Sequence, residues 1–399
     1  MTILSVSLSR IKPSPTMAVV KKATELKAAG KDIISLGAGE PDFDTPDNIK
    51  KAAIEAIQNG KTKYTIVDGT IELKRAIMQK FKRENSLTYN EKQVTVGVGG
   101  KHVIFNAILA TINPGDEVII PAPYWVSYPD IVLLAGGTPK FIECSEANDF
   151  KINPKQIEKN ITSKTKWIIL NSPSNPTGSV YTKQELLEIG AVLKKFPHVL
   201  IMSDDIYEHV LYDNLEFFTI AQIPDLFSRT LTINGLSKSY AMTGWRVGYA
   251  GGSEDLIQAM GKIQSQSTTN TSSISQAAAV EALNGVQSFI KPRADAFKER
   301  RDFVVKKLNE TKGISCKNPQ GAFYVFPNCK GCIGKKDKHG KRIENDTDFV
   351  TSLLERAGVA VVQGSAFGLE GYFRISYATS MDNLVKALDK IKLFCEELV

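Results

Sequence analysis

The sequence has no apolar run long enough to span a membrane, and Met1 to Arg10 lack the charged and then apolar pattern of a secretion signal. It holds only five cysteines, an odd number scattered between Cys144 and Cys395, which does not indicate a disulfide framework. Internal repeats, disordered tails and long linkers are also missing. We therefore expect a soluble protein of the reducing cytoplasm without a membrane partner.

The sequence also lacks a large excess of one charge, since it has 50 lysines and arginines and 43 aspartates and glutamates. The net charge of +7 is spread through the chain, which suits solubility and a mild attraction for small anionic substrates and does not indicate a nucleic-acid surface. The 399 residues, of which 42% are hydrophobic and 23% charged, predict a globular protein of roughly two to three domains.

The common nucleotide-binding motifs are absent as well. Gly97-Val98-Gly99-Gly100-Lys101 follows a predicted strand, Val94 to Val96, and opens a predicted helix from His102 to Ile112. His102 stands where the dinucleotide motif needs its last glycine, and Thr95 stands where the Walker motif needs its first. A glycine-rich turn at the start of a helix still offers free N–H groups and the positive end of the helix dipole. We therefore predict a phosphate site of another kind.

A complete zinc motif is also missing. Cys329-x-x-Cys332 opens a lysine- and glycine-rich insert that runs to Arg342, but no second pair of ligands follows, and His339 alone does not complete a site. We interpret the insert as a surface loop without a metal, which either covers a site or lies apart from it.

Short apolar runs alternate with helical patterns after residue 113. The runs are Glu117 to Ile120, Lys166 to Asn171, Val199 to Ser203 and Thr230 to Ile233. Thr182-x-x-Glu185 is a capping box that opens one of the helices between them. Such alternation predicts a mainly parallel sheet covered by helices on both faces, with the functional loops at the strand ends. Long helices follow Gly251, and we expect a smaller C-terminal domain.

Chemically unusual residues follow these strands. They are Pro123-Tyr124-Trp125, Asn175-Pro176-Thr177-Gly178, Asp204-x-x-Tyr207 and Lys238. An N-terminal loop from Ser35 to Pro46 is rich in glycine and proline, so its backbone can approach a ligand closely. Thr45 is expected to cap the helix that follows this loop.

Lys238 is the main candidate for covalent chemistry. It lies in the stretch from Asn234 to Arg246, directly after a run of mainly β-branched residues. A lysine whose pKa is lowered by burial and neighbouring charge can form a Schiff base with a carbonyl cofactor. Arg246 can hold a phosphate bidentately. From these residues alone, Lys238 can equally be a solvated loop lysine and Arg246 an ion-pair partner.

Four motifs together resemble one family. They are Ser-Lys-Ser-Tyr-Ala-Met-Thr-Gly-Trp-Arg at 237–246, Asn-Ser-Pro-Ser-Asn-Pro-Thr-Gly at 171–178, Asp-Asp-Ile-Tyr at 204–207 and Phe-Arg-Ile-Ser at 373–376. From about Leu8 to its last helix the chain resembles the class I aminotransferases of the fold-type-I pyridoxal-phosphate enzymes, and among them the bacterial aspartate aminotransferase branch. The resemblance implies an α/β fold with a large domain around a mainly parallel seven-stranded sheet and a smaller α/β domain from both termini. The expected boundaries are 1–46 for an N-terminal segment that joins the small domain, 47–290 for the large domain and 291–399 for the rest of the small one.

The resemblance implies pyridoxal 5'-phosphate as the cofactor. Lys238 matches the lysine that forms the internal aldimine with the cofactor aldehyde and then serves as general base at the substrate Cα. Asp204 matches the carboxylate that pairs with the protonated pyridine nitrogen, and Tyr207 matches a residue that hydrogen-bonds the ring oxygen. The other implied cofactor-binding positions are Gly99, Gly100, Lys101, Trp125, Asn175, Ser237 and Arg246, with Tyr64 reaching across from the other subunit. The expected assembly is therefore a homodimer.

The resemblance also implies the substrate contacts. Arg374 matches the arginine that grips the α-carboxylate, and the distal carboxylate is expected at Lys101 and at the loop from Ser14 to Thr16. The remaining substrate-binding positions are Gly39, Trp125, Asn175 and Phe323, the last as a pocket wall. The expected reaction transfers an amino group from L-aspartate to 2-oxoglutarate, giving oxaloacetate and L-glutamate with ping-pong kinetics.

Other specificities stay open. One charge-assisted contact contributes about 1.5 to 3 kcal/mol, a preference of roughly ten- to a hundredfold for acidic over neutral substrates. Activity on prephenate, arogenate or aromatic amino acids is therefore an alternative, as is β-elimination. A non-catalytic cofactor-binding regulator is disfavoured, because no DNA-binding segment is visible and every catalytic position is filled. Asp205 and Gln363 depart from the glutamate and proline common in the family, which bears on substrate range.

Overall fold

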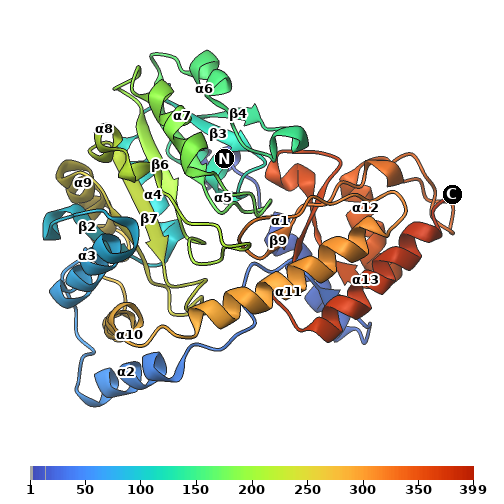
Figure 1. The fold of residues 1–399 in the computed structure, drawn as a ribbon, viewed down its shortest axis with the longest axis horizontal. Coiled ribbons are helices and arrows are strands. Elements are labelled where there is room, and N and C mark those ends of the chain that lie inside the picture. Colours follow the sequence, from blue (N-terminus) through green and yellow to red (C-terminus); the bar gives the residue numbers. More distant parts are fainter. Residues whose placement is uncertain (1–2, 14) are drawn as a thin grey trace.

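A seven-stranded sheet lies at the centre of the computed structural model, which describes residues 3–13 and 15–399 (Figure 1). Its strands are β2 (Val94–Gly97), β3 (Glu117–Ala122), β4 (Thr138–Glu143), β5 (Thr165–Asn171), β6 (Leu200–Asp204), β7 (Thr230–Gly235) and β8 (Gly248–Gly251). They follow the order β2-β8-β7-β6-β5-β3-β4. β8 runs antiparallel to both of its neighbours, and the other pairings in this sheet are parallel. The expected α/β class and the mainly parallel seven-stranded sheet are confirmed.

Helices cover both faces of this sheet, because alternate residues of a strand point to opposite sides. One face carries α4 (Gly100–Thr111), α5 (Ser127–Leu134) and α9 (Glu254–Ser265), and the other carries α6 (Pro154–Asn160), α7 (Lys183–Leu193) and α8 (Pro224–Phe227). Val118 and Ile120 of β3 are buried against the first set of helices, and Ile119 is buried against the second. The capping box predicted at Thr182 is confirmed at the start of α7.

Two strands have no counterpart among the apolar runs of the sequence. β4 lies at the sheet edge with Thr138 and Glu143 exposed, so it shows no continuous apolar run. β8 has the sequence Gly-Tyr-Ala-Gly, which lacks β-branched residues, although all four residues are buried. A side chain is excluded at Gly248, since a Cβ atom there would lie 2.2 Å from the amide nitrogen of Gly100. This close approach seats the start of α4 against the sheet.

Three further helices, α2 (Asp47–Gln58), α3 (Ile71–Asn85) and α10 (Ser273–Asn284), pack with β2 and β8. The prediction that Thr45 caps α2 is wrong, because Pro46 occupies the N-cap position and no side chain caps the helix. The Thr45 hydroxyl instead donates a 2.6 Å hydrogen bond to Ala241 O and accepts one of 2.9 Å from Trp245 Nε1. Thr45 therefore ties the N-terminal loop to the segment that follows Lys238.

The C-terminal part of the chain forms a smaller α/β unit that α11 (Ile290–Asn309) joins to the rest (Figure 1). It contains β9 (Tyr324–Val325), β10 (Val359–Ala360), β11 (Val362–Gln363), β12 (Phe373–Ser376), α12 (Asp346–Ser352) and α13 (Met381–Glu396). The start of the chain joins it, because β1 (Ile34–Ser35) pairs in parallel with β10 and α1 (Pro15–Ala28) packs beside this pair. Both termini thus build the smaller unit, as expected. The boundaries after residues 46 and 290 stay a prediction.

The insert from Cys329 to Arg342 is anchored to the C-terminus. The Lys336 N–H donates a 2.8 Å hydrogen bond to Val399 O, and Cys332 Sγ lies 4.0 Å from Cys395 Sγ. Most residues between 334 and 342 are exposed, but Cys329 and Cys332 are buried in the core. The interpretation as a surface loop is therefore wrong for the two cysteines. Across residues 3–13 and 15–399, no helix is both long and apolar enough to cross a membrane.

Candidate active site

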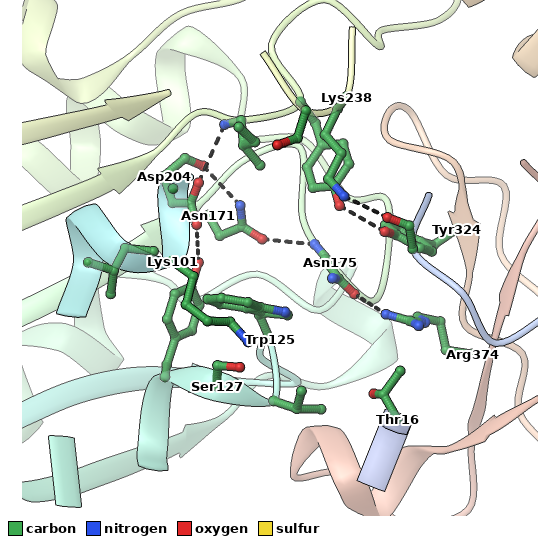
Figure 2. Close-up of a pocket in the computed structure, with 18 of the residues that line it drawn as sticks. Thr16, Lys101, Trp125, Ser127, Asn171, Asn175, Asp204, Lys238, Tyr324 and Arg374 are labelled. Carbon is green, nitrogen blue, oxygen red and sulfur yellow. Dashed lines mark hydrogen bonds between the residues drawn. The ribbon is translucent and has the colours of Figure 1, made fainter. Parts of the chain in front are cut away.

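A cavity of about 280 Å³ opens where β5, β6 and β7 end (Figure 2). The starts of α1, α4 and α5, the N-terminal loop, β9 and β12 supply its other walls. The predicted positions that line it are Thr16, Gly39, Gly100, Lys101, Trp125, Asn175, Asp204, Tyr207, Ser237, Lys238, Arg246 and Arg374. Residues that are distant in sequence therefore converge at the strand ends. The insert at 329–342 contributes none of the lining residues, so it lies apart from the cavity.

Lys238 reaches the cavity from the loop after β7. Its Nζ donates a 2.6 Å hydrogen bond to the carbonyl oxygen of Gly39. The ring centroids of Tyr207 and Phe323 lie 5.8 and 5.9 Å from Nζ. Burial and, to a smaller extent, the positive charge of Arg374 lower the pKa of Lys238 to about 8. A solvated loop lysine is thereby excluded, and the neutral amine that a nucleophile or base requires is accessible near neutral pH.

Asp204, the last residue of β6, is buried with 6% of its surface exposed. Its Oδ2 accepts a 2.5 Å hydrogen bond from the Tyr128 hydroxyl, and its Oδ1 accepts one of 3.4 Å from the Ile206 N–H. Burial raises the pKa of Asp204, and the hydrogen bond from Tyr128 acts against this rise. No lysine, arginine or histidine of the described chain forms an ion pair with it. This carboxylate suits a cationic ligand atom, such as a protonated ring nitrogen.

Hydrogen bonds hold the polar side chains that lie between Asp204 at the end of β6 and Tyr324 in β9. Asn171 Nδ2 donates to Asp204 O at 2.9 Å, and Asn171 Oδ1 accepts from the Asn175 N–H at 2.8 Å. The hydroxyl groups of Tyr207 and Tyr324 lie 2.8 Å apart. Asn171 thus links Asp204 to Asn175, while Tyr207 and Tyr324 form a separate pair, and these bonds restrict the orientation of each side chain.

Arg374 in β12 is 3% exposed, yet no carboxylate of the described residues pairs with it. Its Nη1 donates to Asn175 Oδ1 at 2.8 Å and its Nη2 donates to Gly37 O at 2.6 Å, while Nε has no partner in the described chain. Its guanidinium carbon lies 4.6 Å from the ring centroid of Tyr324. A buried guanidinium of this kind is a site for an anion, and its fork matches a carboxylate. In Figure 2, Asp204 and Arg374 lie at opposite ends of the labelled group.

The glycine-rich turn between β2 and α4 forms another anion site. The Gly100 and Lys101 N–H groups belong to the first turn of α4, where no intrahelical acceptor exists. Gly99 precedes them at φ 84°, a conformation that glycine adopts without strain, and its own N–H donates to Gly97 O at 2.8 Å. Gly99 therefore shapes the turn and does not offer a free N–H. Arg246 lies beside it, with Nη1 donating to Thr243 O at 2.9 Å.

The remaining wall combines one cation with apolar groups. Lys101 Nζ lies 5.0 Å from the ring centroid of Trp125, and burial and the charge of Arg246 lower the pKa of Lys101. The hydroxyl oxygen of Thr16 is buried without a hydrogen-bond partner in the part of the chain that the structure describes. Ser14, predicted beside it, lies outside the described residues. Met17 and Ile104 make this end of the cavity partly apolar.

Three predicted positions do not line the cavity. Gly99 lies in the turn behind it, and Phe323 is fully buried while its neighbour Tyr324 lines the wall. The role of Phe323 as a pocket wall therefore stays a prediction. Tyr64 is 90% exposed and also lies outside the lining, so its role across a subunit interface stays a prediction. Sequence reasoning missed Tyr128, Asn171 and Tyr324, of which only Asn171 stands inside a motif recognised from the sequence.

Comparisons with known proteins agree with this geometry. The family described as Aminotransferase class I and II matches residues 31–391. An aspartate/prephenate aminotransferase from Cereibacter sphaeroides is 60% identical over the full length of both chains. The crystal structure of an aspartate aminotransferase from Rhizobium meliloti superimposes with a TM-score of 0.97 at 51% identity and covers 100% of both chains. An aspartate aminotransferase from Thermus thermophilus with maleate has a TM-score of 0.92 at 41% identity, covering 99% of this chain and 100% of that one.

Proposed function

Because the chain belongs to the class I and II aminotransferases, we propose that it transfers the amino group of L-aspartate to 2-oxoglutarate, giving oxaloacetate and L-glutamate. One observation carries the proposal. A single cavity holds an amine whose pKa is lowered to about 8 in Lys238, together with the Asp204 carboxylate and the Arg374 guanidinium, neither of which has an ion-pair partner among the described residues.

Pyridoxal 5'-phosphate, the cofactor of this family, fits these groups. When bound, it supplies an aldehyde for an amine and a ring that draws electrons from the neighbouring carbon. Asp204, which is buried without an ion-pair partner among the described residues, would hold the protonated ring nitrogen, and Trp125 would cover the ring face. Tyr207 and Asn175 would hold the ring oxygen. The phosphate would be held by Gly100, Lys101, Ser237 and Arg246.

Residues of the chain would bind the substrate and move its proton. Arg374 binds the α-carboxylate of the substrate and thereby fixes the direction of its Cα–H bond. Lys238 is the base that moves a proton at Cα, and its lowered pKa leaves it neutral often enough to do so. The carbonyl oxygen of Gly39 keeps the Lys238 amine inside the cavity, 2.6 Å away.

Lys101 and Thr16 support a substrate with a second carboxylate. Both residues line the cavity. Lys101 offers a cation, and Thr16 offers a buried hydroxyl group without a hydrogen-bond partner in the described chain. The relative from Thermus thermophilus was solved with maleate, which is a four-carbon dicarboxylate like aspartate and oxaloacetate.

Prephenate is a second candidate amino acceptor, because the relative from Cereibacter sphaeroides carries this activity in its name. The distal end of the cavity favours it as well. Met17, Ile104 and Val126 line the cavity together with Lys101, so it offers apolar contacts to a ring beside a charge for a carboxylate.

We also propose a homodimer in the cytoplasm, with Tyr64 reaching the phosphate site of the partner. Ile54, Ile57, Tyr64 and Ile66 are 53–90% exposed in α2 and the segment after it, and large apolar side chains of this kind mark an interaction surface. The five cysteines are free and buried, which suits a reducing compartment.

Stopped-flow half-reactions test the proposed substrates. The protein loaded with pyridoxal phosphate is mixed with aspartate, glutamate, phenylalanine or arogenate, and the absorbance change of the cofactor is recorded. We expect aspartate and glutamate to react at least tenfold faster than phenylalanine, since one charge-assisted contact separates them. Equal rate constants would contradict the acidic specificity, and a fast reaction of arogenate would establish the second candidate. Protein that stays colourless with the cofactor would contradict the whole proposal.

A further inference from the structure

The peptide of Val98, in the turn between β2 and α4, is held on both of its sides. Its N–H donates a 3.1 Å hydrogen bond to Nδ1 of His102. Its carbonyl oxygen accepts one of 3.3 Å from Arg246 Nη2. The proposed phosphate site uses Arg246, whereas His102 has no role in that site so far.

Two glycines allow these side chains to lie so close. A Cβ atom at Gly97 would lie 3.2 Å from His102 Nδ1 and 3.0 Å from Val103 Cγ2. A Cβ atom at Gly99 would lie 2.3 Å from Arg246 Nη2. Gly99 thus needs to lack a side chain, because of both this contact and its φ of 84°, and glycine at position 97 leaves the His102 ring room to approach the turn.

The hydrogen bonds of the turn select which amides stay free. The Gly99 N–H donates to Gly97 O, and the His102 and Val103 N–H groups donate to Gly99 O at 3.0 and 3.3 Å. With the Val98 N–H bound by His102, the Gly100 and Lys101 N–H groups remain without an acceptor in the described chain. Both residues line the cavity.

The ring of His102 has one tautomer that fits. Nδ1 accepts a hydrogen bond, so the neutral ring carries its proton on Nε2. Burial lowers the pKa of His102, which favours the neutral ring. The side chain sits at the third position of α4 and reaches back to the backbone before the helix, as glutamate and glutamine do in a capping box.

We propose that His102 is a positioning residue for the cofactor phosphate: its ring fixes the Val98 peptide, so that the Gly100 and Lys101 N–H groups point together at the phosphate. His102 itself does not touch the ligand. The inference rests on the proposed function, because it assumes that pyridoxal phosphate is the ligand of this turn.

Binding of two vitamers tests it, since pyridoxal has the aldehyde and ring of pyridoxal phosphate but lacks the phosphate. Cofactor-free protein is titrated with each, and imine formation with Lys238 is followed by absorbance. We expect His102→Leu to raise the dissociation constant of pyridoxal phosphate about tenfold, the effect of losing one hydrogen bond to a backbone amide, and to leave that of pyridoxal unchanged. His102→Gln retains an acceptor at this position, so it should restore binding to within about threefold of the parent.

Three results would overturn the inference. If His102→Leu lost the same affinity for both vitamers, His102 would have a general structural role. If it lost no affinity for pyridoxal phosphate, His102 would have no role in phosphate binding. A His102→Gln protein as weak as His102→Leu would exclude the hydrogen bond as the cause. Should His102→Leu fail to fold, His102→Met, with a flexible apolar side chain, takes its place. A parent protein that binds neither vitamer would overturn the proposed function instead, which separates the two failures.

Discussion

The hydroxyl group of Tyr128 donates a 2.5 Å hydrogen bond to Oδ2 of Asp204. Tyr128 belongs to α5, and Asp204 ends β6, so the contact joins a helix on one face of the sheet to the end of a strand. It is the shortest hydrogen bond that the Asp204 carboxylate makes. Within the apolar surroundings that raise the pKa of Asp204, this bond helps to keep the carboxylate charged.

We therefore expect Tyr128→Phe to raise the pKa of Asp204 further. The neutral carboxyl group would no longer support a protonated ring nitrogen, so the half-reaction with aspartate should slow by about tenfold near neutral pH. The acid limb of its pH profile should move to higher pH, because Asp204 would need a higher pH to ionise. Stopped-flow rates between pH 5 and 9 measure this shift. Tyr124→Phe is a matched control that removes a hydroxyl outside the cavity, and an unmoved acid limb in Tyr128→Phe would contradict the assignment.

Lys101→Ala should narrow the preference for acidic substrates. Without the ammonium group beside Trp125, kcat/KM for aspartate should fall by roughly ten- to a hundredfold, while that for phenylalanine should change little. The ratio of the two constants is the measurement, since it cancels any general damage to cofactor binding by the same residue. Lys92→Ala, at an exposed position before β2, serves as the control. An unchanged ratio would place the distal carboxylate elsewhere.

Lys238 gives the cofactor-free protein a defined pH dependence. Its pKa of about 8 lies below the ordinary value of 10.5, so between these values the unfolded chain binds more protons than the folded one. The free energy of unfolding therefore rises with pH through this window. Below pH 8 the folded protein carries the full destabilisation that comes from burying the Lys238 ammonium group. Lys238→Met removes the penalty and should be more stable than the parent by about 1 to 3 kcal/mol at pH 7.

Urea unfolding of both cofactor-free proteins measures this difference. The gap between them should close as the pH approaches 10.5. Lys92→Met, at an exposed lysine, is the control. Its free energy of unfolding should differ from that of the parent by the same small amount at both ends of this pH range. A gap for Lys238→Met that does not depend on pH would mean that the amine is not perturbed.

Lys80 and Glu208 form a buried ion pair between α3 and the turn after β6. Burial raises the pKa of Glu208, but the charges of Lys80 and His209 outweigh it and hold that pKa below its ordinary value. Lys80→Met should cost about 3 to 5 kcal/mol of stability, because it removes the ammonium group that directly pairs with this buried carboxylate and leaves it only the amides of Asn85 and Asn234 and the more distant His209. The double variant Lys80→Met with Glu208→Leu should recover most of this loss. Denaturant unfolding tests both, with Lys291→Met at the exposed pair with Asp295 as a control expected to cost less than about 0.5 kcal/mol.

Much of the site could be predicted because it lies at strand ends. Asp204 closes β6 and Lys238 follows β7, and apolar runs reveal both strands in the sequence. Tyr128 could not be found this way, since its contact with Asp204 depends on how α5 packs against the sheet. Tyr324 could not be found either, since the sequence does not tell which of the neighbours Phe323 and Tyr324 faces the cavity.

The same limit applies to the fold. Five strands of the central sheet have apolar sequences and could be predicted. β4 is a polar edge strand, and β8 owes its place to Gly248, where only a residue without a side chain lets the Gly100 amide approach. The edge position of β4 and the close approach at Gly248 depend on tertiary contacts, so no local sequence pattern predicts them.

The parallel pair of β1 and β10 joins residues 34–35 to residues 359–360, and Arg374 binds the carbonyl oxygen of Gly37. During synthesis on the ribosome, Asp204 at the end of β6 and Lys238 after β7 emerge well before the later of these partners do. Residues 34–37 must then wait until residues 359–374 have been translated. The hydrogen bond that holds Arg374 in place therefore forms only when residues 34–37 and 359–374, far apart in sequence, have come together.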